Sequence, residues 1–175
     1  MNFIPYSKQT IFQEDIDSAL RLVLIIGLPA TLGLLILAEP LITTLFFYGA
    51  FTAHDATMSS MSLMAYSFGL LGFILVKILA PAFYARKDMK TPVKVAIVAL
   101  VTNTVLNLIL IGPFAHVGLA AATTVSAFVN AGLLYWYLQK QNVFTPMHGW
   151  GRLIVQILLA NVVLVGFLLS ISLAV

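Results

Sequence analysis

One apolar run limits what this chain can fold into more than any other feature of its sequence. Residues 60–84 contain a single charged side chain, Lys77, and a basic cluster follows directly after them. As a helix rising about 1.5 Å per residue, the run is roughly 37 Å long, enough to cross a bilayer core of about 30 Å. Only 9% of all residues are charged, whereas a soluble domain carries about 25%. We therefore predict an all-α integral membrane protein.

Further apolar runs bring the expected number of transmembrane helices to five. The spans are predicted at about 19–38, 60–84, 93–111, 117–138 and 152–173. Because the connection at 112–116 is very short, the third and fourth spans should be antiparallel neighbours, whereas 41–59 is expected to be a loop. Residues 19–175 then form one membrane domain. The cytoplasmic segment 1–18 that precedes it is either a short interfacial helix or a frayed tail.

The positions of the basic residues predict the orientation of the chain. Two loops on one side, 39–59 and 112–116, contain no Lys or Arg. All basic residues outside the spans, together with three at span ends, fall on the other side: Lys8, Arg21, Arg86, Lys87, Lys90, Lys94, Lys140 and Arg152. Since cytoplasmic loops concentrate Lys and Arg, the N-terminus is predicted to be cytoplasmic.

Lys77 is the residue that most needs a chemical explanation. It lies about 10 Å inside the predicted cytoplasmic end of its helix, where a cation indicates a substrate path, an ion path or a paired partner. The alternative is that its long stem lets the ammonium reach the headgroups. Tyr66 and Phe73 lie near the same helical stripe and are candidates for the same path. Small residues on a separate face are expected to pack closely against another helix: Ala65, Gly69, Gly72 and Ala80.

Two pairs of polar residues at i, i+4 spacing lie inside predicted spans. Asn103 and Asn107 are on the third, and Ser126 and Asn130 are on the fourth. Because polar side chains facing lipid are costly, both pairs should face protein or a wet cavity. They are therefore further substrate-path candidates, and the alternative is hydrogen bonding between helices.

The basic cluster after residue 84 is a candidate for binding anionic headgroups or a pyrophosphate. It consists of Arg86, Lys87 and Lys90, and clusters of this kind attract anionic lipids. The alternative is that these residues only set the topology. The sequence has no cysteine, its three histidines lack metal-ligand spacing, and no glycine-rich phosphate loop follows a strand. We therefore expect no metal, no cofactor, no catalytic group and no nucleic-acid partner.

The most specific block of the sequence is 65–100, AYSFGLLGFILVKILAPAFYARKDMKTPVKVAIVAL. Flanking it are FFYGAFTAHDA on one side, and HVGLA, LLYWYLQKQ and FTPMHGW on the other. Together these blocks resemble the MurJ (MviN) family, the proposed lipid II flippases of bacterial cell-wall synthesis. That family belongs to the multidrug/oligosaccharidyl-lipid/polysaccharide exporter superfamily, and the resemblance covers nearly the whole chain from about residue 10.

The resemblance implies a partial protein. Family members have fourteen helices in two lobes that alternate access around a central cavity, and this chain resembles about helices nine to thirteen, a partial C-terminal lobe. It would then be part of a flippase that moves lipid II from the inner to the outer leaflet, not active as this fragment alone. Its implied partners are lipid II, membrane lipids and the missing N-terminal lobe, in the bacterial inner membrane. Lys77 would supply one cation for the pyrophosphate.

A different interpretation stays open beside this one. The chain would be a non-transporting membrane remnant or an assembly fragment, from a truncated or split gene. An in-frame sequence directly upstream, encoding the remaining helices, would distinguish the first interpretation from the second.

Overall fold

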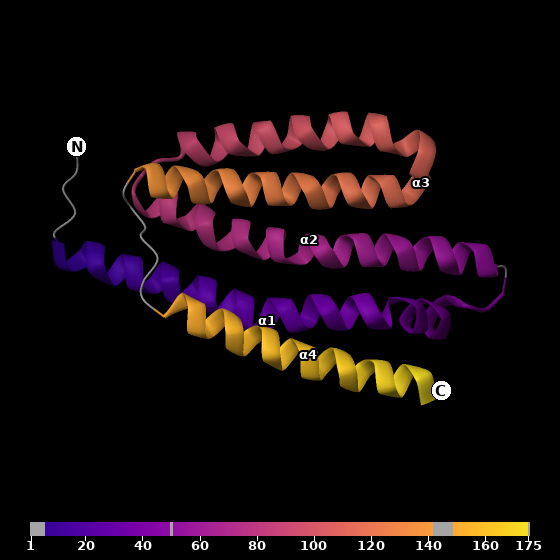
Figure 1. Ribbon diagram of the computed structural model, residues 1–175. Helices are drawn as coiled ribbons and strands as arrows, with labels where there is room; N and C mark the ends of the chain where they lie inside the picture. Colours follow the sequence, from indigo (N-terminus) through magenta and orange to yellow (C-terminus); the bar gives the residue numbers. More distant parts are fainter. Residues whose placement is uncertain (1–5, 50, 142–148, 175) are drawn as a thin grey trace.

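The computed structural model describes residues 6–49, 51–141 and 149–174, with side chains for 13–49, 51–141 and 149–170. Every secondary-structure element among them is a helix: α1 is Tyr6–Phe46, α2 is Ala53–Ala85, α3 is Lys90–Lys140 and α4 is Trp150–Ala174. All four helices are long and apolar enough to cross a membrane. Figure 1 shows them lying roughly along one common direction. The prediction of an all-α membrane protein is confirmed.

Among the described residues there are four continuous helices where five spans were predicted, because α3 includes both the third and the fourth expected spans on either side of a bend. Figure 1 shows that α3 doubles back on itself, so that a first limb (90–114) and a second limb (116–140) lie side by side. The bend is at Ala115, whose φ of 46° and ψ of −123° are not helical. Pro113 lies within helical backbone just before this bend. Its fixed φ is compatible with helical geometry, and neighbouring groups in a membrane protein can satisfy the carbonyl it leaves unpaired.

The connection between the first and second helices is shorter than the predicted loop at 41–59. Helix α1 continues through Glu39 and Pro40 to Phe46, where the Thr43 hydroxyl donates to the carbonyls of both residues. Helix α2 already begins at Ala53, and Thr52 and Asp55 form a reciprocal capping box at its start. At the other end, α1 runs without a break through residue 18.

Helix α2 is the centre of the packing, since it contacts both α1 and α3, whereas α4 contacts α1. The predicted small-residue face of α2 packs on the second limb of α3. A Cβ atom added at Gly69 would lie 2.7 Å from Thr124 Oγ1, and one added at Gly72 would lie 3.1 Å from the backbone of Ala127. In lipid, where the hydrophobic effect does not drive helices together, such close contact is what holds them.

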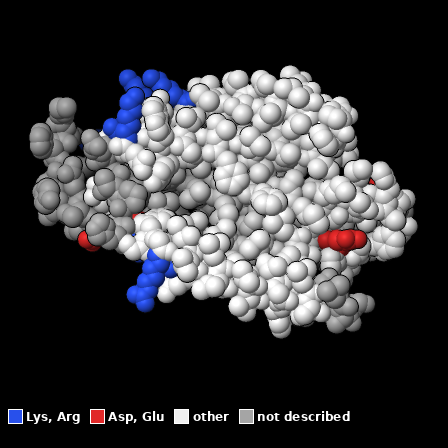
Figure 2. Space-filling view, viewed as in Figure 1, with Lys and Arg blue, Asp and Glu red and all other residues white. Residues whose placement is uncertain are grey.

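The basic residues gather at one end of the bundle. Helices α1 and α4 begin at this end, α2 ends there, and α3 both begins and ends there (Figure 1). The Lys and Arg side chains visible in Figure 2 lie toward the same end. We call it the basic end, and the end where α2 begins and α3 bends the opposite end.

Candidate functional site

A polar cleft lies between α2 and both limbs of α3, with a volume of about 360 Å³. Five of the seven predicted substrate-path residues line it together: Phe73, Lys77, Asn103, Ser126 and Asn130. The rest of its lining consists of small and aliphatic side chains: Val76, Ala96, Ala99, Leu100 and Ala127. The fold thus brings into one space polar groups that are far apart in the sequence.

Lys77 is the one charged residue of this cleft. It lies eight residues before the last residue of α2, so about 12 Å from the basic end of that helix. Its side chain is exposed, and within the described part of the chain no carboxylate is in ion-pair distance of it, since the one salt bridge there joins Arg21 to Asp17. The ammonium is therefore available to an anion that enters the cleft.

The two polar pairs of α3 differ in what they contact. Asn107 Nδ2 donates to Asn103 Oδ1 at 3.1 Å, so this pair bonds within the first limb. Ser126 is buried, and its hydroxyl donates to the Thr123 carbonyl at 2.8 Å. None of these bonds joins two helices. Asn103, Ser126 and Asn130 line the cleft, whereas Asn107 is not among its lining residues.

Tyr66 lies apart from Lys77, in a second pocket near the opposite end. This pocket has a volume of about 640 Å³ and is formed by the start of α2, Phe51 and the bend of α3. Its polar lining residues are Asp55, Ser59, Ser62, Tyr66 and His116. The residues of the predicted stripe on α2 therefore line two separate spaces: Phe73 and Lys77 line the cleft, and Tyr66 lines the second pocket.

The predicted headgroup-binding residues lie on the turn between α2 and α3, at the basic end. The Asp88 N–H donates to the Phe83 carbonyl and the Lys87 N–H to the Tyr84 carbonyl, at 3.0 and 2.9 Å. These bonds form a Schellman cap, in which Lys87 adopts a φ of 61°. Arg86 is held in place by Gln141, whose Oε1 accepts from its guanidinium at 2.9 Å.

This turn also starts α3. The Thr91 N–H and hydroxyl donate to the two carboxylate oxygens of Asp88, at 3.1 and 2.6 Å. The hydroxyl bond is the main reason why the pKa of Asp88 is lowered from its ordinary value. Arg86, Lys87 and Lys90 are all exposed, so the turn presents its cations outward.

One polar cluster was not predicted from the sequence. Asp17 is 2% exposed, accepts from Arg21 Nε at 2.6 Å on one oxygen, and from Trp150 Nε1 at 2.8 Å on the other. The Arg21 guanidinium also lies over the Trp150 ring, 5.6 Å from its centre. The cluster joins the start of α4 to α1. The i, i+4 spacing of Asp17 and Arg21 was its only signal in the sequence.

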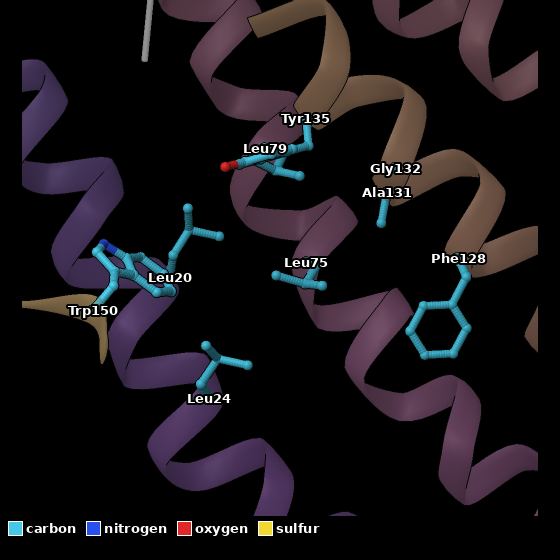
Figure 3. Close-up of a pocket in the computed structure, with 9 residues that line it drawn as sticks. All are labelled: Leu20, Leu24, Leu75, Leu79, Phe128, Ala131, Gly132, Tyr135 and Trp150. Carbon is cyan, nitrogen blue, oxygen red and sulfur yellow. The ribbon is translucent and has the colours of Figure 1, made fainter. Parts of the chain in front are cut away.

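Beside this cluster lies an apolar cavity of about 330 Å³. Figure 3 shows Leu20 and Leu24 on α1, Leu75 and Leu79 on α2, and Phe128 and Tyr135 on the second limb of α3 directed around it, with Trp150 at one side. Its lining contains no charged residue. Unlike the Lys77 cleft, it is therefore not suited to an anionic headgroup.

Comparisons with known proteins agree on one family. The family model described as "Lipid II flippase MurJ" matches residues 6–174. "Probable lipid II flippase MurJ" of Vibrio cholerae is 44% identical over 158 residues, which are 90% of this chain and 30% of that protein. "Lipid II flippase MurJ" of Burkholderia cenocepacia is 42% identical over 153 residues, covering 87% of this chain and 30% of that protein.

A solved structure has the same fold. "Lipid II flippase MurJ, inward closed conformation" superposes with a TM-score of 0.78 at 25% identity, covering 96% of this chain and 34% of that one. The chain thus spans about a third or less of the length of the proteins that it matches.

Proposed function

Since this chain belongs to the lipid II flippase MurJ family, we propose that it is part of the C-terminal lobe of a transporter for a lipid-linked sugar pyrophosphate. The transporter moves lipid II from the inner to the outer leaflet of the bacterial inner membrane by alternating access. This chain supplies one wall of the path and works together with an N-terminal lobe, not alone.

The observation that carries this proposal is the Lys77 cleft. A cation inside a membrane segment is retained where it has a partner or a path to serve, and here the other polar groups of the cleft are neutral. No described carboxylate forms an ion pair with Lys77, and a pyrophosphate would supply that negatively charged partner. Asn103 and Asn130 offer amide donors to the same anion. The cleft is therefore fitted to the charged part of the substrate.

The orientation belongs to the same proposal. With the basic end in the cytoplasm, as the positive-inside rule requires, the Lys77 cleft lies in the cytoplasmic half of the membrane. The exposed cations of the α2–α3 turn, Arg86, Lys87 and Lys90, then face the anionic headgroups of that leaflet. An anionic substrate would be drawn first to this surface and then to Lys77.

A segment exchange tests the proposal. The part of the Vibrio cholerae relative that aligns with this chain is replaced by this chain, and the hybrid is expressed in cells depleted of their own flippase. Growth at a normal protein level is the expected result. Lysis of the depleted cells, although the hybrid reaches the membrane in normal amount, would favour a non-transporting remnant instead.

A further inference from the structure

One stripe of α2 connects the two polar spaces of the structure. Six residues, at positions 55, 59, 62, 66, 73 and 77, fall within about 60° of one another around the helix at 3.6 residues per turn. Phe73 and Lys77 line the cleft, whereas Asp55, Ser59, Ser62 and Tyr66 line the pocket at the opposite end. Tyr66 and Lys77 are 11 positions apart, which is about 16 Å along the axis.

The two spaces have opposite charge. The cleft contains the cation Lys77 and no acidic residue. The pocket at the opposite end contains the carboxylate of Asp55 and neither Lys nor Arg. A phosphate is attracted to the first space and repelled from the second, so the two cannot hold the same part of an anionic substrate.

The side chains of the second pocket are those that bind a neutral, hydroxyl-rich group. Within the described part of the chain, no hydrogen bond engages the Tyr66 hydroxyl or the His116 imidazole, and both side chains are exposed. Asp55 Oδ2 accepts from Thr52, so Oδ1 is available to a ligand hydroxyl. Phe51 adds an apolar ring on which the C–H face of a sugar can lie. The volume of about 640 Å³ is in the usual range for ligand pockets, about 300–1,000 Å³.

We propose that this pocket, formed by Asp55, Ser59, Ser62, Tyr66, His116 and Phe51, is a binding site for the sugar part of the lipid-linked substrate. This inference rests on the proposed function, to which it adds a second binding site for the substrate, at the opposite end of the bundle. The pyrophosphate is held near Lys77, and the sugar is held in the pocket on the same helix face, whose nearest residue, Tyr66, lies about 16 Å from Lys77 along the axis. The path therefore has separate contacts for the charged and the neutral parts of one headgroup.

Sugar binding is measured directly on the purified chain in detergent micelles. The probe is N,N′-diacetylchitobiose, a neutral disaccharide, and the signal is saturation-transfer NMR from protein to sugar protons. We expect saturation of the sugar, with binding weakened about tenfold when both Tyr66→Phe and His116→Ala remove their hydrogen-bonding groups. Met61→Leu, on the same helix but outside the pocket, is the control and keeps wild-type binding. Circular dichroism checks that each variant is helical.

Three outcomes would overturn the inference. They are no saturation of the sugar by the helical wild-type chain, equal binding by the double variant, or displacement of the sugar by inorganic pyrophosphate, which would make the pocket an anion site. Failure of the proposed function looks different. If the hybrid does not support growth but the chain still binds the disaccharide, only the proposed transport function is refuted. If the hybrid supports growth but the chain binds no sugar, only the assignment of this pocket is refuted.

Discussion

Thr124 Oγ1 donates a hydrogen bond to the carbonyl oxygen of Ala65 at 2.6 Å, joining the second limb of α3 to α2 across 59 positions of sequence. The bond needs a glycine one turn farther along α2. A Cβ atom at Gly69 would meet Thr124 Oγ1 at 2.7 Å and Thr124 Cα at 3.3 Å. The close approach of α2 and the second limb of α3 therefore depends on Gly69 and Thr124.

The first prediction follows from this contact. Gly69→Ala should separate α2 from α3 or strain the pair, at a cost of about 1–3 kcal/mol. Gly33→Ala is the matched control, because a Cβ atom there meets nothing within 4 Å. Thermal unfolding of the purified variants in detergent measures the difference. Equal midpoints for the two variants would show that the predicted contact is not made.

A second prediction concerns how α4 is held. Trp150→Phe removes the donor to the buried carboxylate of Asp17, and a hydrogen bond to a charged group contributes about 1.5–3 kcal/mol. The start of α4 should then move more freely against α1. Spin labels at the exposed positions Leu22 and Ile154 should give a broader distance distribution by electron paramagnetic resonance. Trp136→Phe, changing the other tryptophan, should leave it unchanged.

The third prediction concerns the orientation. The chain has no cysteine, so single cysteines report their own position without background. Ala53→Cys, at the start of α2, should react with a membrane-impermeant maleimide added outside the cells. Lys90→Cys, at the start of α3, should react only after the membrane is opened. Labelling of Lys90→Cys in intact cells would reverse the proposed orientation.

The sequence was sufficient for the features that depend on composition and helical period. Long uncharged runs predict membrane helices wherever they occur, and the small-residue face of α2 follows from the spacing of Gly69 and Gly72. The grouping of Lys77 with Phe73 also follows from their position on one helix. These properties belong to single helices and need no knowledge of their neighbours.

The structural features that the sequence did not predict depend on contacts between helices. Pro113 indicates a break, but the non-helical residue is Ala115, because the bend is set by the packing of the two limbs, with Gly118 against the Leu110 carbonyl. Trp150 donates to Asp17 across 133 positions, and no local pattern encodes that pairing. The bend of α3 also brings His116 into the pocket that Tyr66 lines, and no local pattern predicts that pairing.

Variants of Lys77 distinguish the two explanations of this intramembrane cation, which are contact with the substrate and extension of the side chain toward the headgroups. If the ammonium stabilises the pyrophosphate, Lys77→Ala should impair transport at an unchanged protein level. Lys77→Arg should impair it less, because the charge remains, although a guanidinium binds phosphate with a different geometry. If Lys77 only reaches toward the headgroups, removal of the charge should be tolerated as long as an apolar stem is kept.

The most direct measurement is therefore growth of flippase-depleted cells that carry the hybrid transporter with Lys77→Met. Methionine keeps an unbranched apolar side chain and removes the charge, so packing is retained while the anion contact is lost. We predict that these cells fail to grow although the variant is present in the membrane at the level of the unmodified hybrid. Full growth at that protein level would contradict a role for Lys77 in the substrate path.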